Sequence, residues 1–265
     1  MKKKISIIGA GNLTLSLLSS IEACSKDYII SIVDNNSSRK RLLKKHKVSF
    51  VSNIDNNISE SKVIFLNVKP KDSSSVLKSL KPYVGAKNII ISFMAGIKVN
   101  DIKKALDTET SVIRCMTNIS AINNDAIIFY FMKKFNKQHS DLLSTVFKKQ
   151  KQLIECKSED ELNKITALYG SAPAYYILFN ETIKNIYKKL GYTSSQASKL
   201  SDNLFIGTAN LIKSGLSGKD LINSIASKGG TTEAALKELS KSRIDKSLYN
   251  AIKTAIKKSK ELAKN

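Results

Sequence analysis

Apolar residues follow one pattern before about residue 158 and a different one after it. In the first part, short runs rich in β-branched residues alternate with stretches of helical spacing, which is typical of a parallel sheet with crossover helices. This pattern predicts strands at Lys4–Gly9, Tyr28–Val33, Val63–Val68, Asn88–Ser92, Ser111–Met116, Ala126–Phe131 and Lys151–Glu155.

In the second part the strand pattern disappears and apolar residues recur at helical spacing. The helices predicted there are Ala172–Lys189, Ser194–Ser214, Gly218–Ala226, Thr231–Leu239 and Lys246–Leu262. No linker rich in proline or glycine separates the two parts, so the boundary depends on the change of pattern alone. We therefore expect an α/β domain over residues 1–158 and an all-helical domain over residues 159–265.

The composition agrees with a globular protein, since 42% of the 265 residues are hydrophobic and 25% are charged. The longest apolar runs are far shorter than the ~20 residues that span a bilayer. After three lysines, the apolar run Ile5–Ile8 ends at a glycine and is too short for a signal peptide. We therefore expect no membrane partner and a cytoplasmic location.

The formal net charge of +22 raises the question of a nucleic-acid partner. Base-reading proteins favour arginine, with aromatic residues interleaved where single strands stack. Here only four of the 44 basic residues are arginine, and the lysines are spread over almost the whole chain. We therefore expect no nucleic-acid partner, although a positive field would attract an anionic ligand such as a phosphorylated dinucleotide.

The cysteines and histidines carry no recognisable site. Cys24, Cys115 and Cys156 are odd in number and far apart, which argues against a disulfide framework or a structural metal site. His46 and His139 lie in lysine-rich segments and are predicted to be ordinary surface residues. No metal ligands are assigned.

The first predicted strand leads through Gly9-Ala10-Gly11-Asn12-Leu13 into a stretch with helical spacing. This is the dinucleotide-binding arrangement, in which glycines let backbone N–H groups approach a pyrophosphate at the positive end of a helix. Thr14 stands where the third glycine of the fingerprint is normal. A plain strand-to-helix turn is the alternative interpretation.

Residues after the second predicted strand bear on the choice of cofactor. Asp34 is placed to accept hydrogen bonds from ribose hydroxyls, which favours NAD. Asn35, Ser37 and Arg39 follow it and offer donors for a 2′-phosphate, which favours NADP. The same residues are also ordinary helix caps. The choice between the two cofactors stays open.

Three further segments follow predicted strands, at the edge where open α/β sheets bind ligands. They are Val68-Lys69-Pro70, Ala95-Gly96, and the stretch from Arg114 to Asn118. Proline and glycine are also common turn residues. A buried ion pair explains Arg114 as well as a cofactor contact does.

The segment Ser227-Lys228-Gly229-Gly230-Thr231-Thr232-Glu233 lies between two predicted helices. Its glycines and threonines place backbone N–H groups and hydroxyls at a helix N-terminus, which can receive a carboxylate. A glycine stop followed by a threonine cap is the alternative.

In this order, the segments resemble the motifs of the pyrroline-5-carboxylate reductase family. Gly9–Leu13 resembles Gly-x-Gly-Asn-Met, Val68–Pro70 resembles Val-Lys-Pro, and Ser227–Thr232 resembles Ser-Pro-Gly-Gly-Thr-Thr. Three more matches are Ala95–Ile97 with Ala-Ala-Gly-Ile/Val, Arg114–Asn118 with the start of Arg-x-Met-Pro/Thr-Asn-Thr-Pro, and Gly170–Tyr175 with Gly-Ser-Gly-Pro-Ala-Tyr. The departures are Thr14, Ile119, Ser120, Ala172 and Lys228.

The resemblance implies a Rossmann-type N-terminal domain and a helical domain that interlocks two chains into a homodimer, often within larger rings. It implies reduction of the C=N bond of a cyclic imino acid to L-proline with NADPH or NADH. The cofactor-binding residues would be Gly9, Ala10, Gly11, Asn12, Leu13, Asp34, Asn35, Ser37, Arg39, Val68, Lys69, Pro70, Ala95, Gly96 and Asn118. The substrate-binding residues would be Glu181, Ser227, Gly229, Gly230, Thr231 and Thr232, with the Thr232 hydroxyl on the ring nitrogen as the catalytic contact.

Two alternatives stay open beside this hypothesis. One is a related reductase of another small imino acid or carbonyl substrate, because Lys228 adds a cation next to the carboxylate site. The other is a non-catalytic dinucleotide-binding homologue, because several motifs depart from the family pattern.

Overall fold

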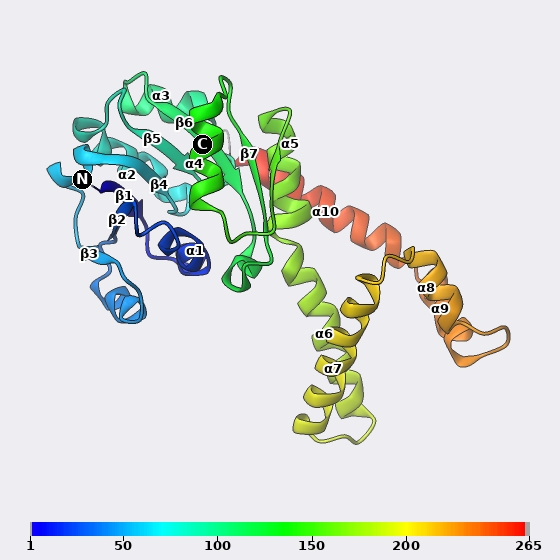
Figure 1. Ribbon diagram of the computed structural model, residues 1–265. Helices are drawn as coiled ribbons and strands as arrows, with labels where there is room; N and C mark the ends of the chain where they lie inside the picture. Colours follow the sequence, from blue (N-terminus) through cyan, green and yellow to red (C-terminus); the bar gives the residue numbers. More distant parts are fainter. Residues whose placement is uncertain (1, 263–265) are drawn as a thin grey trace. The chain divides into compact units, whose positions relative to one another are not determined.

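The computed structural model describes residues 2–262 and divides into two compact units (Figure 1). One unit contains the chain up to Ser171 together with the segment from Ala255 onward, and the other contains Ala172–Thr254. Helix α5 (Glu159–Ile165), which follows the predicted boundary at residue 158, lies in the first unit. That boundary stays a prediction.

The first unit is built on an eight-stranded sheet with the order β3-β2-β1-β4-β5-β6-β7-β8. All seven predicted strands are present, which confirms the Rossmann-type domain. The sheet also contains β3, which the pattern did not predict, because it has three residues and no fully buried side chain. The strands are β1 (Lys3–Ile8), β2 (Tyr28–Val33), β3 (Ser49–Val51), β4 (Ser61–Leu66), β5 (Ile89–Ser92), β6 (Ser111–Met116), β7 (Ile127–Phe131) and β8 (Gln152–Glu155).

Every neighbouring pair of strands is parallel except β6 and β7. The link between these two strands holds only the 3-10 helix Ile119–Asn123. A parallel pair needs a crossover of a dozen or more residues, whereas a short link returns the chain in the opposite direction. The expected parallel sheet therefore has one antiparallel pair.

Helices and shorter turns connect these strands. The α-helices of the first unit are α1 (Asn12–Glu22), α2 (Ser73–Leu80), α3 (Val99–Leu106), α4 (Lys137–Val146) and α5. The 3-10 helices are Ser37–Leu43, Asn56–Glu60, Pro70–Asp72, Lys81–Tyr83 and Ile119–Asn123, and a π-helical turn covers Thr166–Gly170.

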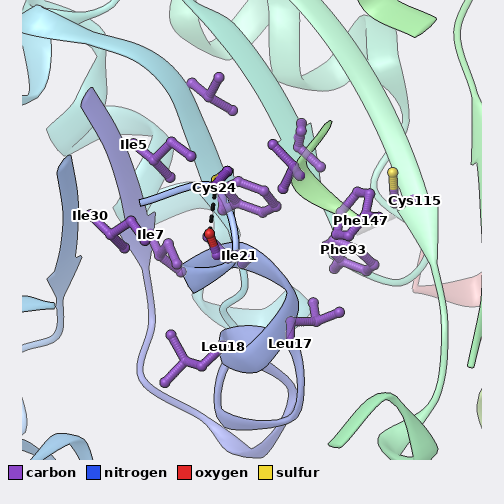
Figure 2. Close-up of a cluster of buried hydrophobic side chains, with 14 of the residues drawn as sticks. Ile5, Ile7, Leu17, Leu18, Ile21, Cys24, Ile30, Phe93, Cys115 and Phe147 are labelled. Carbon is purple, nitrogen blue, oxygen red and sulfur yellow. Dashed lines mark hydrogen bonds between the residues drawn. The ribbon is translucent and has the colours of Figure 1, made fainter. Parts of the chain in front are cut away.

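Both faces of the sheet are buried, as continuous apolar strands predict. On one face, side chains of β1 and β2 pack with Leu17, Leu18 and Ile21 of α1 (Figure 2). In the same cluster Phe147 meets Phe93 edge-on, with ring centroids 6.1 Å apart. The other face carries a second cluster made with α2 and α3. This core holds the strand ends in fixed register.

The second unit consists of helices with little buried surface. They are α6 (Ala172–Lys189), α7 (Ser194–Ile212), α8 (Gly218–Ile225), α9 (Thr231–Lys241) and the first part of α10 (Ile244–Glu261). No residue of α6, α8 or α9 is buried, and α7 buries only Ala197 and Ser201. Leu178 is 68% exposed and Leu204 is 59% exposed. This unit therefore lacks a closed core of its own.

Within residues 2–262, no helix combines the length and apolar character that a membrane crossing requires.

Candidate cofactor and substrate sites

The carboxyl ends of neighbouring parallel strands lie along one edge of the sheet. Backbone hydrogen bonds fix their level: Gly9 N donates to Val33 O at 2.8 Å, and Asn67 N donates to Ile8 O at 2.9 Å. One strand further along, Phe93 N donates to Leu66 O at 3.0 Å. The segments predicted to bind the cofactor, after β1, β2, β4, β5 and β6, therefore follow one another along this edge.

The glycine turn after β1 has the form that a phosphate receptor needs. Gly9 has φ +101°, and a Cβ there would lie 2.8 Å from Asn67 O, so a side chain would meet backbone. Gly11 is the N-cap of α1, whose first turn carries no side-chain cap and no acidic residue. The positive end of α1 is therefore left to an anion, which fits the pyrophosphate of a dinucleotide.

Thr14, the departure from the glycine fingerprint, is accommodated inside the turn. Its side chain is fully buried, and its hydroxyl donates to Gly9 O at 2.5 Å and accepts from Asn67 Nδ2 at 3.1 Å. The hydroxyl thus ties the start of α1 to the end of β1. The third glycine of the fingerprint normally allows close packing of helix and strand. Here the Thr14 hydrogen bond to Gly9 holds the two elements together instead.

Asp34 faces the glycine turn. Its Oδ2 accepts from Ala10 N at 2.7 Å, and its Oδ1 accepts from Asn36 N at 2.8 Å. Arg39 crosses the same turn, because its Nη1 donates to Ala10 O at 2.8 Å. The Arg39 side chain is 37% exposed and that of Asp34 only 13%. Both carboxylate oxygens of Asp34 thus already hold backbone N–H groups, whereas the guanidinium reaches solvent beside the turn.

The other predicted cofactor residues occupy turns of different kinds. Val68 lies beside Gly9, since its Cγ1 would be 3.1 Å from a Cβ at that glycine. Lys69 precedes the 3-10 helix Pro70–Asp72 as its N-cap. Gly96, with φ +80°, forms the turn after β5. Asn35 and Ser37 are exposed at the start of the 3-10 helix after β2.

The Asn118 side chain holds local structure. Its Oδ1 accepts from Ser120 N at 2.9 Å, and its Nδ2 donates to Tyr169 O at 3.3 Å in the π-helical turn. The Tyr169 hydroxyl accepts from Ile127 N at 2.7 Å, which links that turn to β7. A direct contact between Asn118 and the cofactor stays a prediction.

Arg114 makes the buried ion pair that was left open as an alternative. It is 1% exposed, and it donates to Glu159 Oε1 at 2.9 Å and to Asn163 Oδ1 at 3.2 Å. Glu159 Oε1 also accepts from Val99 N at 2.9 Å. This network ties β6, α3 and α5 together, which is a structural role.

The loop between α8 and α9 is built from its glycines. Gly229 has φ +75°, and Gly230 N donates to Ser227 O at 3.0 Å. A Cβ at Gly230 would lie 2.5 Å from Ser227 Oγ, so a side chain would force the loop open. Helix α9 starts at Thr231 with no side-chain cap on Gly230. The glycines thus fix the shape of this loop, and its binding of a carboxylate stays a prediction.

The sequence interpretation included Glu233, in the first turn of α9, in the loop segment but assigned it no role. Its Oε2 accepts from Gly229 N at 2.7 Å, and its Oε1 lies 3.1 Å from Lys237 Nζ. The hydrogen bond from Gly229, followed by that from Lys237, lowers the pKa of the Glu233 carboxyl. A glutamate three residues after an N-cap is a known capping signal, but it predicts a bond from the N-cap N–H of Gly230, and the donor here is Gly229, one residue earlier.

Glu181, the remaining predicted substrate residue, belongs to a polar network between α6 and α7. It accepts from Lys184 Nζ at 2.8 Å, and Lys184 also lies 2.8 Å from Asp202 Oδ1. Asn180 donates to Asp202 at 2.6 Å. Hydrogen bonds to Asp202 and then Glu181 raise the pKa of Lys184. Glu181 itself is 54% exposed, so its carboxylate stays open to solvent.

The buried cysteines and histidine offer no thiol or acid–base catalyst. Burial raises the pKa values of Cys24 and Cys115, and it raises that of Cys156 to about 11. These thiols therefore stay protonated at neutral pH. The prediction that His139 lies on the surface is wrong: it is 5% exposed in α4 beside Phe135, and burial lowers its pKa. Because the residues around His139 in the sequence are rich in lysine, the pattern did not show that His139 lies on the buried face of α4.

Two family models match the chain. Residues 159–262 match a model described as pyrroline-5-carboxylate reductase dimerisation. Residues 4–96 match a model described as NADP oxidoreductase, coenzyme F420-dependent. The first match runs from α5 through α10, and the second covers the glycine turn and the strands from β1 to β5.

Individual proteins match over nearly the whole length. A pyrroline-5-carboxylate reductase of Staphylococcus aureus (strain COL) is 31% identical over 98% of this chain and 98% of its own length. A solved pyrroline-5-carboxylate reductase from Coxiella burnetii has a TM-score of 0.84 at 26% identity, over 100% of both chains. A Plasmodium falciparum pyrroline carboxylate reductase, solved with NADP bound, has a TM-score of 0.85 at 22% identity over 98% of each chain.

Proposed function

We propose, from the premise that this chain belongs to the pyrroline-5-carboxylate reductase family, that it reduces the C=N bond of pyrroline-5-carboxylate to give L-proline. The protein is an NAD(P)H-dependent oxidoreductase. The observation that carries the proposal is the full-length match at 31% identity, joined to a glycine turn that leaves the first turn of α1 uncapped.

The cofactor binds at the edge of the sheet where the parallel strands end. The turn at Gly9 and Gly11 holds the pyrophosphate against the N-terminus of α1. Arg39, which reaches solvent beside this turn, receives the 2′-phosphate of NADPH, whereas Asp34 is held by backbone N–H groups. The chain therefore prefers NADPH over NADH. When bound, the reduced nicotinamide supplies the hydride to the imine carbon.

The substrate binds at the loop between α8 and α9. Ser227, Thr231 and the backbone of Gly229 and Gly230 form the site for the carboxylate of the imino acid. The Thr232 hydroxyl holds the ring nitrogen, and Glu181 lies on α6 as a further substrate residue. A protonated imine is already electrophilic, so the chain needs to orient the ring and exclude water rather than supply a strong acid.

A homodimer completes the helical half. The exposed leucines and isoleucines of α6, α7 and α8 form more apolar surface than a monomer keeps in contact with water. A second copy covers this surface, and a larger ring of dimers is part of the proposal. The proposal also includes a cytoplasmic location, which agrees with the three free, buried cysteines.

The proposal is tested by initial rates with pyrroline-5-carboxylate, its six-membered homologue and a small carbonyl acid, each with NADPH and with NADH. We expect pyrroline-5-carboxylate with NADPH to give the highest kcat/KM. A preference for another acid would identify a related reductase. Cofactor binding without turnover on any substrate would identify a non-catalytic homologue.

Thr232→Val tests the catalytic contact. Loss of one hydrogen bond to the ring nitrogen is worth about twofold to tenfold in turnover, and cofactor binding should not change. Thr254→Val on α10, where the hydroxyl is exposed and bonds Asn250 O, is the matched control. Full turnover of Thr232→Val at saturating substrate would remove Thr232 from the site.

A further inference from the structure

A carboxylate of the chain itself occupies the loop that the substrate carboxylate is proposed to use. Glu233 Oε2 accepts from Gly229 N at 2.7 Å, while Glu233 Oε1 lies 3.1 Å from Lys237 Nζ. Glu233 therefore has two partners, one in the substrate loop and one a turn further along α9. Only the first partner belongs to the proposed substrate site.

We propose that Glu233 determines substrate affinity: its carboxylate competes with the imino acid for the Gly229 amide, and Lys237 holds it after displacement. This inference rests on the proposed function, because that function places the substrate carboxylate on Gly229–Thr231. Only one carboxylate oxygen can take the amide in good geometry. The substrate must therefore displace Glu233 before it binds fully.

Glu233 and Gly229 lie close together in the same chain, which strengthens this competition. Glu233 lies four positions after Gly229 in the chain, and groups linked that closely compete at an effective concentration on the order of millimolar. Displacement also brings two negative charges close together at the start of α9. Lys237 relieves this cost, because Glu233 keeps its second partner 3.1 Å away when it leaves the loop.

The two partners predict opposite changes in affinity. Glu233→Ala removes the competitor, so KM for pyrroline-5-carboxylate should fall about twofold to tenfold with kcat unchanged. Lys237→Met removes the cation that offsets the repulsion between the displaced Glu233 and the substrate carboxylate, so KM should rise. In the double variant Lys237→Met should have no further effect, because it acts through Glu233. A capping role for Glu233 predicts instead that Glu233→Ala loosens the loop and raises KM.

The matched control is Glu238→Gln on the same helix. Glu238 pairs with Lys241 at 3.2 Å, and its side chain is 72% exposed. The substitution Glu238→Gln removes one negative charge from α9 without changing a contact of the loop. KM should therefore stay at the value of the unmodified protein, which separates the contact with Gly229 from a change of overall charge.

A spectroscopic readout follows the amide itself. Gly229 is the only glycine preceded by lysine, so lysine labelled with carbonyl ¹³C and glycine labelled with ¹⁵N give one correlated signal for the Lys228–Gly229 bond. We expect Glu233→Ala to shift this signal in the absence of ligand. Titration with L-proline and oxidised cofactor should shift it in both proteins, at lower L-proline concentration in Glu233→Ala.

The outcomes separate this inference from the proposed function. Turnover with KM unchanged or raised in Glu233→Ala would overturn the competition while leaving the function in place. L-proline binding that leaves the Gly229 signal unmoved would also overturn it. Absence of both turnover and L-proline binding in the unmodified protein would overturn the proposed function, and this inference with it.

Discussion

The two units of the chain bury their apolar residues to very different degrees. In the first unit both faces of the sheet are covered, and residues such as Ile5, Phe65 and Leu66 are fully buried. In the second unit three helices contain no buried residue at all. Leu190 and Ile212 are 71% and 65% exposed.

This difference shows which unit carries its own stability. The sheet has a core that can fold from one chain, whereas the helical unit presents apolar faces that require a partner. The proposed substrate loop and Glu181 lie on those helices. We therefore predict that folding of the helical unit, dimerisation and assembly of the proposed substrate site are coupled.

The largest effect is expected from a charge on the helical surface. Leu204→Glu on α7 would place an uncompensated charge in the dimer interface, at a cost of about 3–5 kcal/mol. The dimer dissociation constant should rise at least about a hundredfold, and activity should fall with it. Sedimentation velocity with parallel rate measurements checks this result.

Ile29→Glu is the matched control for that variant. Ile29 is 55% exposed, close to the value for Leu204, but lies in β2 of the first unit. It should leave the dimer intact. An intact, active dimer of Leu204→Glu would show that α7 needs no partner at this position.

The second effect concerns the core of the first unit. Arg114→Met leaves Glu159 partly buried without its cation, and we expect the free energy of unfolding to fall by about 3–5 kcal/mol. Urea unfolding followed by circular dichroism measures it. Lys137→Met, in a pair whose side chains are 90% and 63% exposed, should cost less than about 1 kcal/mol. Equal losses would contradict a structural role for Arg114.

The third effect is at the sheet edge. Arg39→Ala removes a charged donor to the 2′-phosphate, which is worth about 1.5–3 kcal/mol, so the Kd of NADPH should rise about tenfold to a hundredfold. The Kd of NADH should change much less. Isothermal titration calorimetry measures both, with the exposed Arg41→Ala as control. Equal weakening of both cofactors would place Arg39 on the pyrophosphate or the turn.

The smallest effect involves the part of α10 that belongs to the first unit, from Ala255 onward. Lys260, followed by Lys164, lowers the pKa of the exposed Asp160 by hydrogen bonding. A depressed carboxylate pKa stabilises the fold above the unfolded pKa, and this contribution disappears as the pH falls through the folded value. Lys260→Met should lower the free energy of unfolding by less than about 1 kcal/mol at pH 7.

The free energies of unfolding of Lys260→Met and the unmodified protein should therefore start to converge below about pH 4 and become equal below the folded pKa of Asp160. A difference between the two proteins that persists at low pH would show that Lys260 contributes through packing rather than through Asp160.

The parts of the fold that could be predicted are those with a periodic pattern. Apolar runs at β1 and β4 and the glycines at Gly9 and Gly11 are local signals, and the structure has each element there. The antiparallel course of β7 was not predicted from its apolar run, which carries no direction, although the short link after β6 is a signal against a parallel pair. Likewise the buried face of His139 depends on how α4 packs, which its lysine neighbours do not show.

Polar contacts were harder to predict than elements. Spacing placed Asp34 where it could bind ribose but did not predict that its carboxylate accepts from Ala10 N and Asn36 N. The ribose contact stays a prediction. Thr14 weakened the fingerprint as a sequence, yet its hydroxyl closes the turn. Such hydrogen bonds depend on side-chain directions that spacing alone does not fix.

The central claim is hydride transfer to the imine carbon, and an isotope measurement tests it most directly. The protein is incubated with pyrroline-5-carboxylate and NADPH that carries deuterium at the transferable position of nicotinamide carbon 4, and the product is analysed by mass spectrometry and NMR. We expect L-proline one mass unit heavier, with the deuterium on the ring carbon that was double-bonded to nitrogen. Unchanged substrate, or L-proline without deuterium from either face of the nicotinamide, would contradict the account.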